Sequence, residues 1–308
     1  EIVTTDVLLK AGIGIQDLNA VRRHISQLNG GMLAKRIEAR GAELIGFGIS
    51  DAVGKPQTED ISIPRPDYHG TPIGPDETTF DDARRVIRIT HTEDLLPKPV
   101  VDYIKNGSAD QETPKSFPQN TYFLINTLPD SCKIAEQVAR EMGLNAVTLT
   151  TFLEGESREA GMFFASLARE IQTNSRPFSA PCVILAAGET TTKISDNAEI
   201  RGHGGPSHEL VAAFALAASK VPGACMLSID TEGTDGTTLY AGGLTDSKTA
   251  EAAKLAGIDL YEALRGHAVG EALVALNDAV FTGNTGTNLC DLNVLYVPAA
   301  TSDRFKKS

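Results

Sequence analysis

The chain has 308 residues, enough for two domains of about 150 residues or for one larger one. Its 41% hydrophobic and 22% charged residues are typical of a globular protein with a buried core. The 28 Lys and Arg residues against 40 Asp and Glu residues give a formal net charge of −12, which disfavours nucleic acid and anionic membranes as partners. The longest apolar run, 210–218, covers about half of a membrane span, and no secretory pattern opens the chain.

The first part of the chain mixes helical and irregular patterns. In chain order we expect a helical region over the first forty residues, a short apolar strand over 44–50, an irregular segment over 55–79, and helices over 80–90 and 97–105. Gly30 and Gly31 interrupt the first helical pattern. The polar stretch 107–120 predicts a linker, so we place a domain boundary there.

After residue 120 apolar strands alternate with amphipathic helices. The expected strands are 122–127, 146–152, 182–188 and 225–230, and the expected helices are 131–142, 158–171, 208–221 and 247–256. The strands are continuous apolar runs, which is typical of strands buried on both faces. We therefore predict an α/β fold with two domains, 1–120 and 121–308, the second built on a mostly parallel sheet with helices on both faces.

Four cysteines lie far apart and form no CxxC pair and no zinc-ligand spacing with histidine: Cys132, Cys182, Cys225 and Cys290. Most of them occur in apolar, strand-like segments, which favours small buried thiols over ligands or nucleophiles. Free thiols indicate a reducing compartment, so we expect a cytoplasmic protein.

Polar and Gly-rich segments follow the predicted strands, where open parallel sheets bind their ligands. The candidate residues in these segments are Ser50, Asp51, Glu189, Thr190, Gly202, Gly204, Gly205, Asp230, Asp235, Thr282, Gly283, Thr285, Gly286 and Asn288. Any one such loop can be a simple tight turn, because Gly tolerates positive φ. Several together predict backbone N–H groups for an anion beside carboxylates that suit Mg²⁺ or a hydroxyl group, which is the combination that phosphoryl transfer needs.

Other common site patterns are missing from the sequence. There is no GxxxxGK[ST] phosphate loop, no GxSxG elbow and no HExxH pair. The GIG of residues 12–14 lacks the third glycine of a dinucleotide fingerprint. His208 follows the Gly-rich segment 202–205, and an exposed histidine at a helix start is the favoured interpretation of it.

Six ordered segments resemble the class II glycerate 2-kinase family, whose members are often labelled hydroxypyruvate reductase. In the C-terminal part they are GETTTKI, GHGGPSHEL, SIDTEGTDG and TGNTGTNLCDL, which resemble the family's MOFRL-type domain. Upstream they are LNAVRRHISQLNGGMLA and ISDAVGKP. The resemblance covers nearly the whole chain and implies an ATP- and Mg²⁺-dependent kinase that phosphorylates the 2-hydroxyl of D-glycerate, with its site between two α/β domains.

The resemblance also implies roles for individual residues. Asp51, beside Ser50, would act as general base or Mg²⁺ partner. The glycines of 202–205 and of 283–286 would face the nucleotide phosphates. Asp230 and Asp235 would support Mg²⁺ or the substrate.

The sequence departs from the family pattern in several ways, two of which concern the catalytic groups directly. The family's N-terminal portion, with a Gly-rich serine loop and a catalytic lysine, is absent, and the chain begins at Glu1 rather than Met, so we expect a processed protein or a piece of a longer one. Pro206 stands where the family supplies an arginine to the reacting phosphate. Three hypotheses follow: a kinase whose missing portion is supplied by another chain or was removed, a non-catalytic accessory relative, and a reductase, which the missing nicotinamide fingerprint disfavours. The expected protein partner is a second chain that supplies the missing segment or a second copy in a homodimer.

Overall fold

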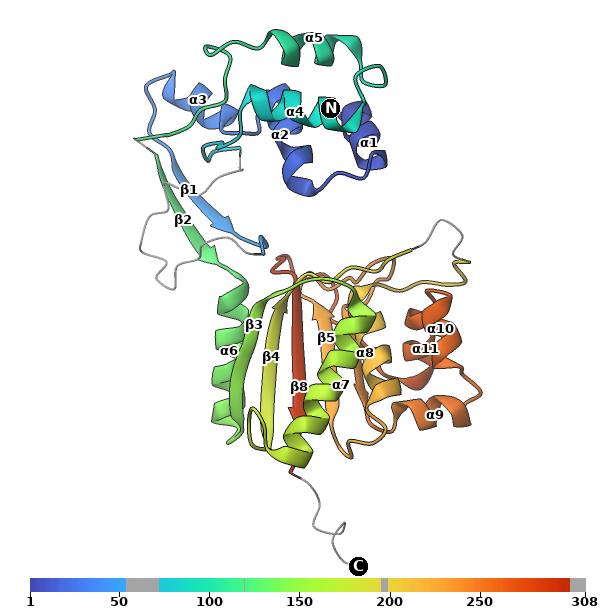
Figure 1. The fold of residues 1–308 in the computed structure, drawn as a ribbon. Helices are drawn as coiled ribbons and strands as arrows, with labels where there is room; N and C mark the ends of the chain where they lie inside the picture. Colours follow the sequence, from blue (N-terminus) through green and yellow to red (C-terminus); the bar gives the residue numbers. More distant parts are fainter. Residues whose placement is uncertain (54–71, 119, 195–198, 300–308) are drawn as a thin grey trace, which may run out of the picture. The chain divides into compact units, whose positions relative to one another are not determined.

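The computed structural model describes residues 1–53, 72–118, 120–194 and 199–299 (Figure 1). The chain folds into two compact units. Unit 1 is Glu1–Gly48 with Asp60–Ile125, and unit 2 is Ile49–Glu59 with Asn126–Ser308. Most of the irregular segment expected over 55–79 lies outside the described residues. Among the helices that are described, none has the length and apolar character to cross a bilayer.

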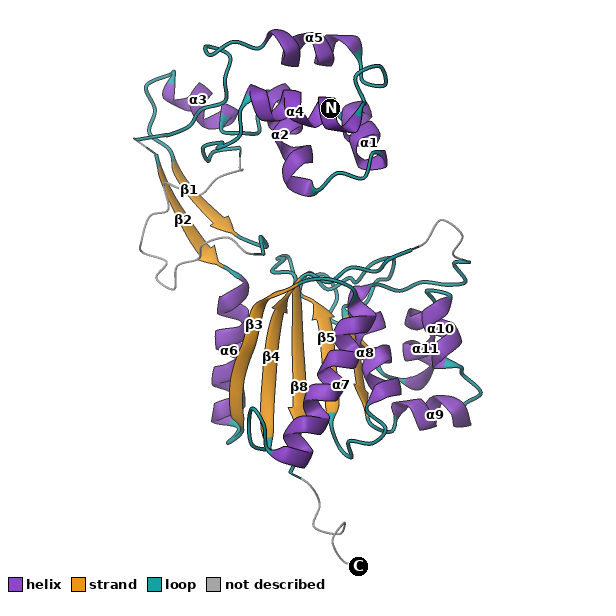
Figure 2. Cartoon of the chain, in the orientation of Figure 1, coloured by secondary structure: helices purple, strands orange, loops and turns teal. Residues whose placement is uncertain are grey.

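Unit 1 is mainly helical (Figure 2). Its elements are α1 (Ile2–Lys10), α2 (Ile15–Ile25), α3 (Met32–Glu38), β1 (Ile45–Ile49), α4 (Phe80–Thr90), α5 (Lys98–Asn106) and β2 (Thr121–Asn126). The first helical region breaks after Lys10 as well as at Gly30 and Gly31. A Cβ at Gly31 would lie 2.7 Å from the Gly74 carbonyl oxygen, so only glycine permits this turn. Helix α4 begins where the Thr79 side chain accepts a hydrogen bond from the Asp82 amide in a capping box.

The helices of unit 1 enclose a small apolar core around Leu8, Val21 and Ile104. A polar network ties the irregular stretch after α5 to this core. The His24 Nε2 lies 2.6 Å from a Glu112 oxygen, and the other Glu112 oxygen accepts a hydrogen bond of 3.1 Å from the backbone amide that begins α4. These bonds fix the segment that leads from α5 to β2.

Unit 2 contains a six-stranded sheet in the order β3-β4-β8-β5-β6-β7. Its strands are β3 (Asn145–Leu153), β4 (Cys182–Gly188), β5 (Cys225–Asp230), β6 (Gly242–Asp246), β7 (Ala279–Val280) and β8 (Asp291–Val297). Its helices are α6 (Leu128–Glu141), α7 (Ser157–Asn174), α8 (Pro206–Ala217), α9 (Thr249–Leu255), α10 (Leu260–Arg265) and α11 (Val269–Leu276).

The α/β class is confirmed, but the expectation that the sheet is mostly parallel is wrong, because most neighbouring strands pair antiparallel. Among the described strands of this six-stranded sheet only β3 and β4 pair in parallel, and β8 pairs antiparallel with both β4 and β5. The difference arises because β8 enters between two strands that run in the same direction, and because β6 returns antiparallel to β5. Sequence reasoning did not predict β6 or β8 as strands.

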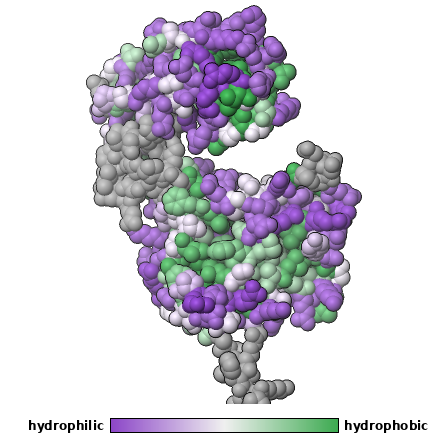
Figure 3. Space-filling model, in the orientation of Figure 1, coloured by the Kyte–Doolittle hydropathy of each residue, from purple (hydrophilic) through white to green (hydrophobic). Residues whose placement is uncertain are grey.

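Helices cover both faces of this sheet, as expected (Figure 1). On one face α6 packs Leu128, Cys132 and Ala139 against residues of β4. On the other face α7 and α8 pack against β4, β5 and β8, and every residue of β4 is buried. Apolar side chains also remain exposed over the outer surface of α7 and α8, among them Met162 and Phe163 (Figure 3).

Candidate functional site

The candidate site lies at the end of the sheet where β4 and β5 finish and β8 begins, that is, beyond the ends of central strands (Figure 1). We call this end of the sheet the sheet edge. In the strand register, Asp291 at the start of β8 is opposite Gly188 at the end of β4 and Asp230 at the end of β5. Glu189 follows β4 directly. The antiparallel insertion of β8 therefore adds a carboxylate to those that sequence reasoning placed at the strand ends.

Three Gly-containing loops pack tightly against one another at this edge. A Cβ at Gly233 would lie 1.9 Å from the Gly283 carbonyl oxygen, and a Cβ at Gly236 would lie 2.3 Å from the Gly204 carbonyl oxygen. Both glycines have positive φ, 96° and 57°. Glycine at these positions lets the loop after β5 contact the loop before α8 on one side and the loop before β8 on the other.

Hydrogen bonds join the same three loops. The Thr237 amide donates to the Gly204 carbonyl over 3.0 Å, and the Thr285 amide donates to the Glu232 carbonyl over 3.1 Å. The Thr285 hydroxyl also donates to the Thr231 carbonyl over 2.6 Å. The Gly-rich segments that the sequence indicated separately thus form one continuous surface around the end of β5.

Helix α8 begins at this surface and presents a buried histidine. Gly205 is the N-cap and Pro206 the first helical residue. The His208 amide donates to an Asp235 oxygen over 3.0 Å, and the His208 Nδ1 contacts the same carboxylate. The Tyr240 ring meets the imidazole edge-on, with ring centroids 5.0 Å apart. The expectation of an exposed His208 is therefore wrong: Asp235 from the loop after β5 holds it in the interior.

The carboxylates of the site repel one another in a poorly solvated environment. Burial raises the pKa of Asp230 to about 6, and nearby Glu232, Asp235 and Glu189 add to the rise. Burial, together with Asp235 and Asp230, also raises the pKa of Asp291 well above its ordinary value. Within the described ranges no ion pair joins Asp230 or Asp291 to a Lys or Arg side chain, so this edge favours a cationic ligand.

Several buried polar atoms near the site have no partner in the described part of the chain. They include both amide atoms of Asn293 and the Thr190 hydroxyl. Asn293 stands two residues after Asp291, opposite Ser228 of β5 and Ala186 of β4. Buried polar groups are normally hydrogen-bonded, so these atoms indicate a place for water or for polar groups of a ligand.

The structure brings the predicted residues of the β1 end to the start of β8. The Cys290 thiol donates to the Asp51 carbonyl over 2.9 Å, and the Ser50 amide donates to the Asn126 carbonyl over 2.9 Å. Val53 packs against the α6 face of the sheet. Asp51 itself is exposed, with its backbone held close to Asp291 by the intervening Cys290.

The remaining predicted residues divide into two groups. Thr282, Gly283, Gly286 and Asn288 belong to the exposed loop before β8, and a Cβ at either glycine would meet nothing within 4 Å. In contrast, a Cβ at Gly202 would lie 2.6 Å from Ala268. Gly202 is therefore explained by packing, whereas Gly283 and Gly286 leave open backbone that a ligand can approach.

Sequence reasoning missed a buried ionic group behind the Gly-rich loop. Glu209 of α8 accepts a 2.5 Å hydrogen bond from Arg158 of α7, and its other oxygen lies 2.8 Å from His267 Nδ1. His267 has a φ of 52° and follows α10. The carbonyl of the preceding residue, Gly266, accepts a hydrogen bond from the Arg201 amide. The group fixes the start of the 201–205 segment, and nothing local in the sequence links residues so far apart.

The carboxylates fit a magnesium ion that is shared with a ligand. The described residues contain no cluster of three or more His, Cys, Asp or Glu side chains able to enclose a metal by themselves. Mg²⁺ usually takes one or two carboxylates and completes its shell with water and substrate phosphates. Asp230, partly buried and close to other acids, is the best placed of the predicted ligands, whereas Asp235 is already engaged by His208.

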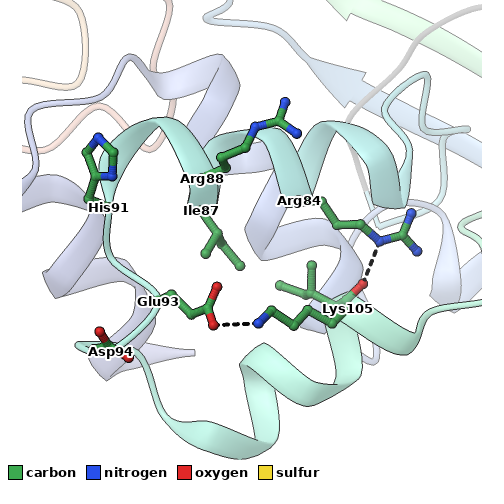
Figure 4. A pocket seen from close by; sticks show the side chains of 8 residues that line it. Arg84, Ile87, Arg88, His91, Glu93, Asp94 and Lys105 are labelled. Atoms are coloured by element: carbon green, nitrogen blue, oxygen red, sulfur yellow. Dashed lines mark hydrogen bonds and ion pairs between the residues drawn. The ribbon is translucent and has the colours of Figure 1, made fainter.

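A cavity of about 510 Å³ in unit 1 contains none of the predicted site residues (Figure 4). It lies between α4 and α5, with Arg88 and His91 at its border. Its other cations are engaged, because Lys105 pairs with Glu93 and the Arg84 Nε donates to the Ile104 carbonyl over 3.0 Å. We assign it no ligand.

The fold and the sheet edge define an α/β protein whose Gly-containing loops and carboxylates meet where its central strands end. The MOFRL family model matches residues 182–291, and a domain of unknown function, DUF4147, matches residues 1–105.

Relatives of the chain carry two kinds of name. A glycerate 2-kinase of Pyrococcus horikoshii is 36% identical over 98% of this chain, and a D-glycerate 2-kinase of Thermotoga maritima is 34% identical over 94%. A protein of Agrobacterium vitis named putative hydroxypyruvate reductase is 32% identical over 94% of this chain and is covered over 71% of its own length. The chain therefore belongs to the glycerate 2-kinase family, and the family resemblance seen in the motifs is confirmed.

A solved structure shares the fold. The crystal structure of a glycerate kinase from Thermotoga maritima superposes with a TM-score of 0.79 at 33% identity, over 95% of this chain and 66% of that one. The chain spans 65% and 64% of the length of the Pyrococcus and Thermotoga relatives.

Proposed function

We propose that the protein takes part in ATP-dependent phosphoryl transfer to the 2-hydroxyl of D-glycerate or of a similar small hydroxy acid. The observation that supports this most is the meeting of three Gly-containing loops with Asp230 and Asp291 at one sheet edge. Phosphoryl transfer depends on positioning and charge neutralisation, and this edge offers backbone donors for phosphates beside carboxylates for a cation.

The nucleotide phosphates would approach the loop that contains Gly283 and Gly286. Both have positive φ, 69° and 78°, and open space on the side where a Cβ would stand. The start of α8 at Gly205 lies against the same surface, but the Asp235 carboxylate already accepts the His208 amide there, so we assign the phosphates to the loop before β8. Backbone groups would then replace the lysine of other phosphate loops.

Magnesium fits the acidic side of the site. Asp230 would hold it together with nucleotide phosphates, and Asp291, opposite Asp230 on the neighbouring strand, would contribute negative charge once the bound cation offsets the rise in its pKa. When bound, the ion supplies neutralisation of the phosphate charge. Asp51, whose backbone is fixed at Cys290, would accept the proton of the attacking hydroxyl or orient it.

Pro206 supports a second candidate function, that of a non-catalytic accessory relative. It stands where the family resemblance implies an arginine for the reacting phosphate, and proline has no charge to offer. Loss of such an arginine costs about 10³-fold or more in rate. Under this alternative the chain keeps ligand binding without turnover.

The free cysteines support a cytoplasmic location as part of the proposal.

The test measures nucleotide binding and turnover separately. Calorimetric titration with ATP and Mg²⁺, followed by an ADP-release assay with D-glycerate, is run on the chain and on Asp230→Asn, with Asp94→Asn in unit 1 as the matched control. We expect ATP binding in the chain and the control, and weaker binding in Asp230→Asn. Binding without ADP release supports the accessory function, and NADH oxidation with hydroxypyruvate but no ATP binding contradicts the kinase proposal.

A further inference from the structure

Within the described residues, the two-stranded sheet of unit 1 has one covered face and one apolar face that no described element covers. A Cβ at Gly46 would lie 2.5 Å from Ile73, and one at Gly48 would meet the Tyr122 hydroxyl, so the glycine side of β1 is filled. Leu124 of β2 is buried. Since side chains alternate along a strand, the odd-numbered residues of both strands point to the other face.

That other face is apolar and exposed to solvent. Ile45 and Phe47 of β1 are 61% and 65% exposed, and Ile125 of β2 is 49% exposed. The rings of Phe47 and Phe123 stack across the strands, with centroids 5.6 Å apart. We call Ile45, Phe47, Phe123 and Ile125 the odd face. Large aliphatic and aromatic side chains grouped on one face mark an interaction surface rather than a solvated one.

The strand direction indicates what covers the odd face. The Thr121 amide donates to the Leu44 carbonyl, and the Ser50 amide donates to the Asn126 carbonyl, both over 2.9 Å. The two strands therefore start together and end together, as parallel strands do. Parallel strands are almost always covered by helices on both faces, and an isolated two-stranded sheet is only marginally stable in water.

Polypeptide of sufficient length for such a helix exists in the relatives. The match covers 65% and 64% of the Pyrococcus and Thermotoga proteins, so about a third of each lies outside it. We propose that the odd face binds an amphipathic helix of a polypeptide outside these 308 residues, equivalent to that unmatched part of the relatives. The proposal is independent of the chemistry at the sheet edge of unit 2.

The test adds that polypeptide in trans. The probe is the part of the Pyrococcus relative that this chain does not match, titrated into the 308-residue chain and followed by native mass spectrometry and fluorescence anisotropy. The variants are Phe47→Ser and Ile125→Ser, and the matched control is Leu255→Ser, an exposed apolar side chain of α9 in unit 2. Because these side chains are exposed, the substitutions leave no cavity, and circular dichroism checks the fold.

We expect a one-to-one complex for the chain and the Leu255→Ser control, and binding about tenfold or more weaker for the two odd-face variants. Hydrogen exchange gives a second measurement without a variant: bound probe should slow exchange at 45–49 and 121–126 and leave α9 unchanged. Equal binding by all variants, or no binding and no protection, overturns the proposal. So does a homodimer that Phe47→Ser dissociates, or binding of lipid vesicles through this face, because either names a different occupant.

Discussion

The packing of the loops around Gly233 predicts a large effect of a single added methyl group. In Gly233→Ala the new Cβ would lie 1.9 Å from the Gly283 carbonyl oxygen, whereas real Cβ atoms stay more than 3.0 Å from such neighbours. The loop before β8 must therefore move away by about 1 Å. Positive φ costs about 1–2 kcal/mol for alanine, and overpacking costs about 1–3 kcal/mol more. We expect a loss of about 2–5 kcal/mol in the free energy of unfolding.

The matched control is Gly257→Ala. Gly257 also has positive φ, 76°, but an added Cβ there would meet nothing within 4 Å. Its expected loss is the backbone cost alone, about 1–2 kcal/mol. Urea unfolding of the full chain at about pH 7 measures both variants, and ATP titration shows whether the loop shift also weakens binding. Equal losses in the two variants would refute the packing argument.

Three further predictions concern ionisable groups. The folded chain keeps a proton on Asp230 up to about pH 6, whereas the unfolded chain releases it near pH 3.8. The free energy of unfolding therefore falls as the pH rises from 3.8 to about 6, and Asp230→Asn should flatten that part of a urea-midpoint profile. Burial opposes ionisation of Glu112, but hydrogen bonds from a backbone amide and from His24 lower its pKa to about 2. Its stabilisation is therefore present above pH 4.5 and lost towards pH 2, and Glu112→Gln should cost about 1–3 kcal/mol at pH 7 in thermal unfolding. Glu209→Gln leaves Arg158 and His267 without their carboxylate and should cost about 3–5 kcal/mol, measured by calorimetry.

Arg201→Gln is the control for these charge variants. Arg201 pairs at the surface with Glu199 and Glu262, so its replacement should change stability by about 1 kcal/mol or less. A loss from Glu209→Gln no larger than this would contradict the view that its network is buried and cooperative. A flat acid profile for the unmodified chain would contradict the ionisation of Glu112 described above.

Continuous apolar runs made much of the fold predictable. The strands expected at 182–188 and 225–230 are present, because a run of apolar residues ended by polar ones has few alternatives in an α/β protein. β8 was not predicted, since Asp291 and Asn293 occupy its inward positions and break the apolar pattern. Polar residues at inward strand positions contradict local preference, and here they lie at the candidate site.

Contacts between distant segments were beyond sequence reasoning. The strand order depends on β8 pairing with β4, more than a hundred residues earlier in the chain, and no local pattern encodes such a partner. The burial of His208 has the same origin, because Asp235 reaches it from another loop. In contrast, the Gly-rich segments were found from composition alone, although only the structure distinguishes Gly202, which packs, from Gly283, which is open.

The central place of β8 also governs when unit 2 can fold during synthesis. At translation speeds of about 5–20 residues per second, β4 leaves the ribosome several seconds before β8 is complete. Until then β4 and β5 each have an unpaired inner edge, and the apolar residues of the main core lack Leu295 and Val297. Such edges are prone to pair with other chains. Nascent unit 2 should therefore need chaperone protection until its last described strand has been made, and premature termination before Asp291 should yield aggregates rather than a smaller folded product.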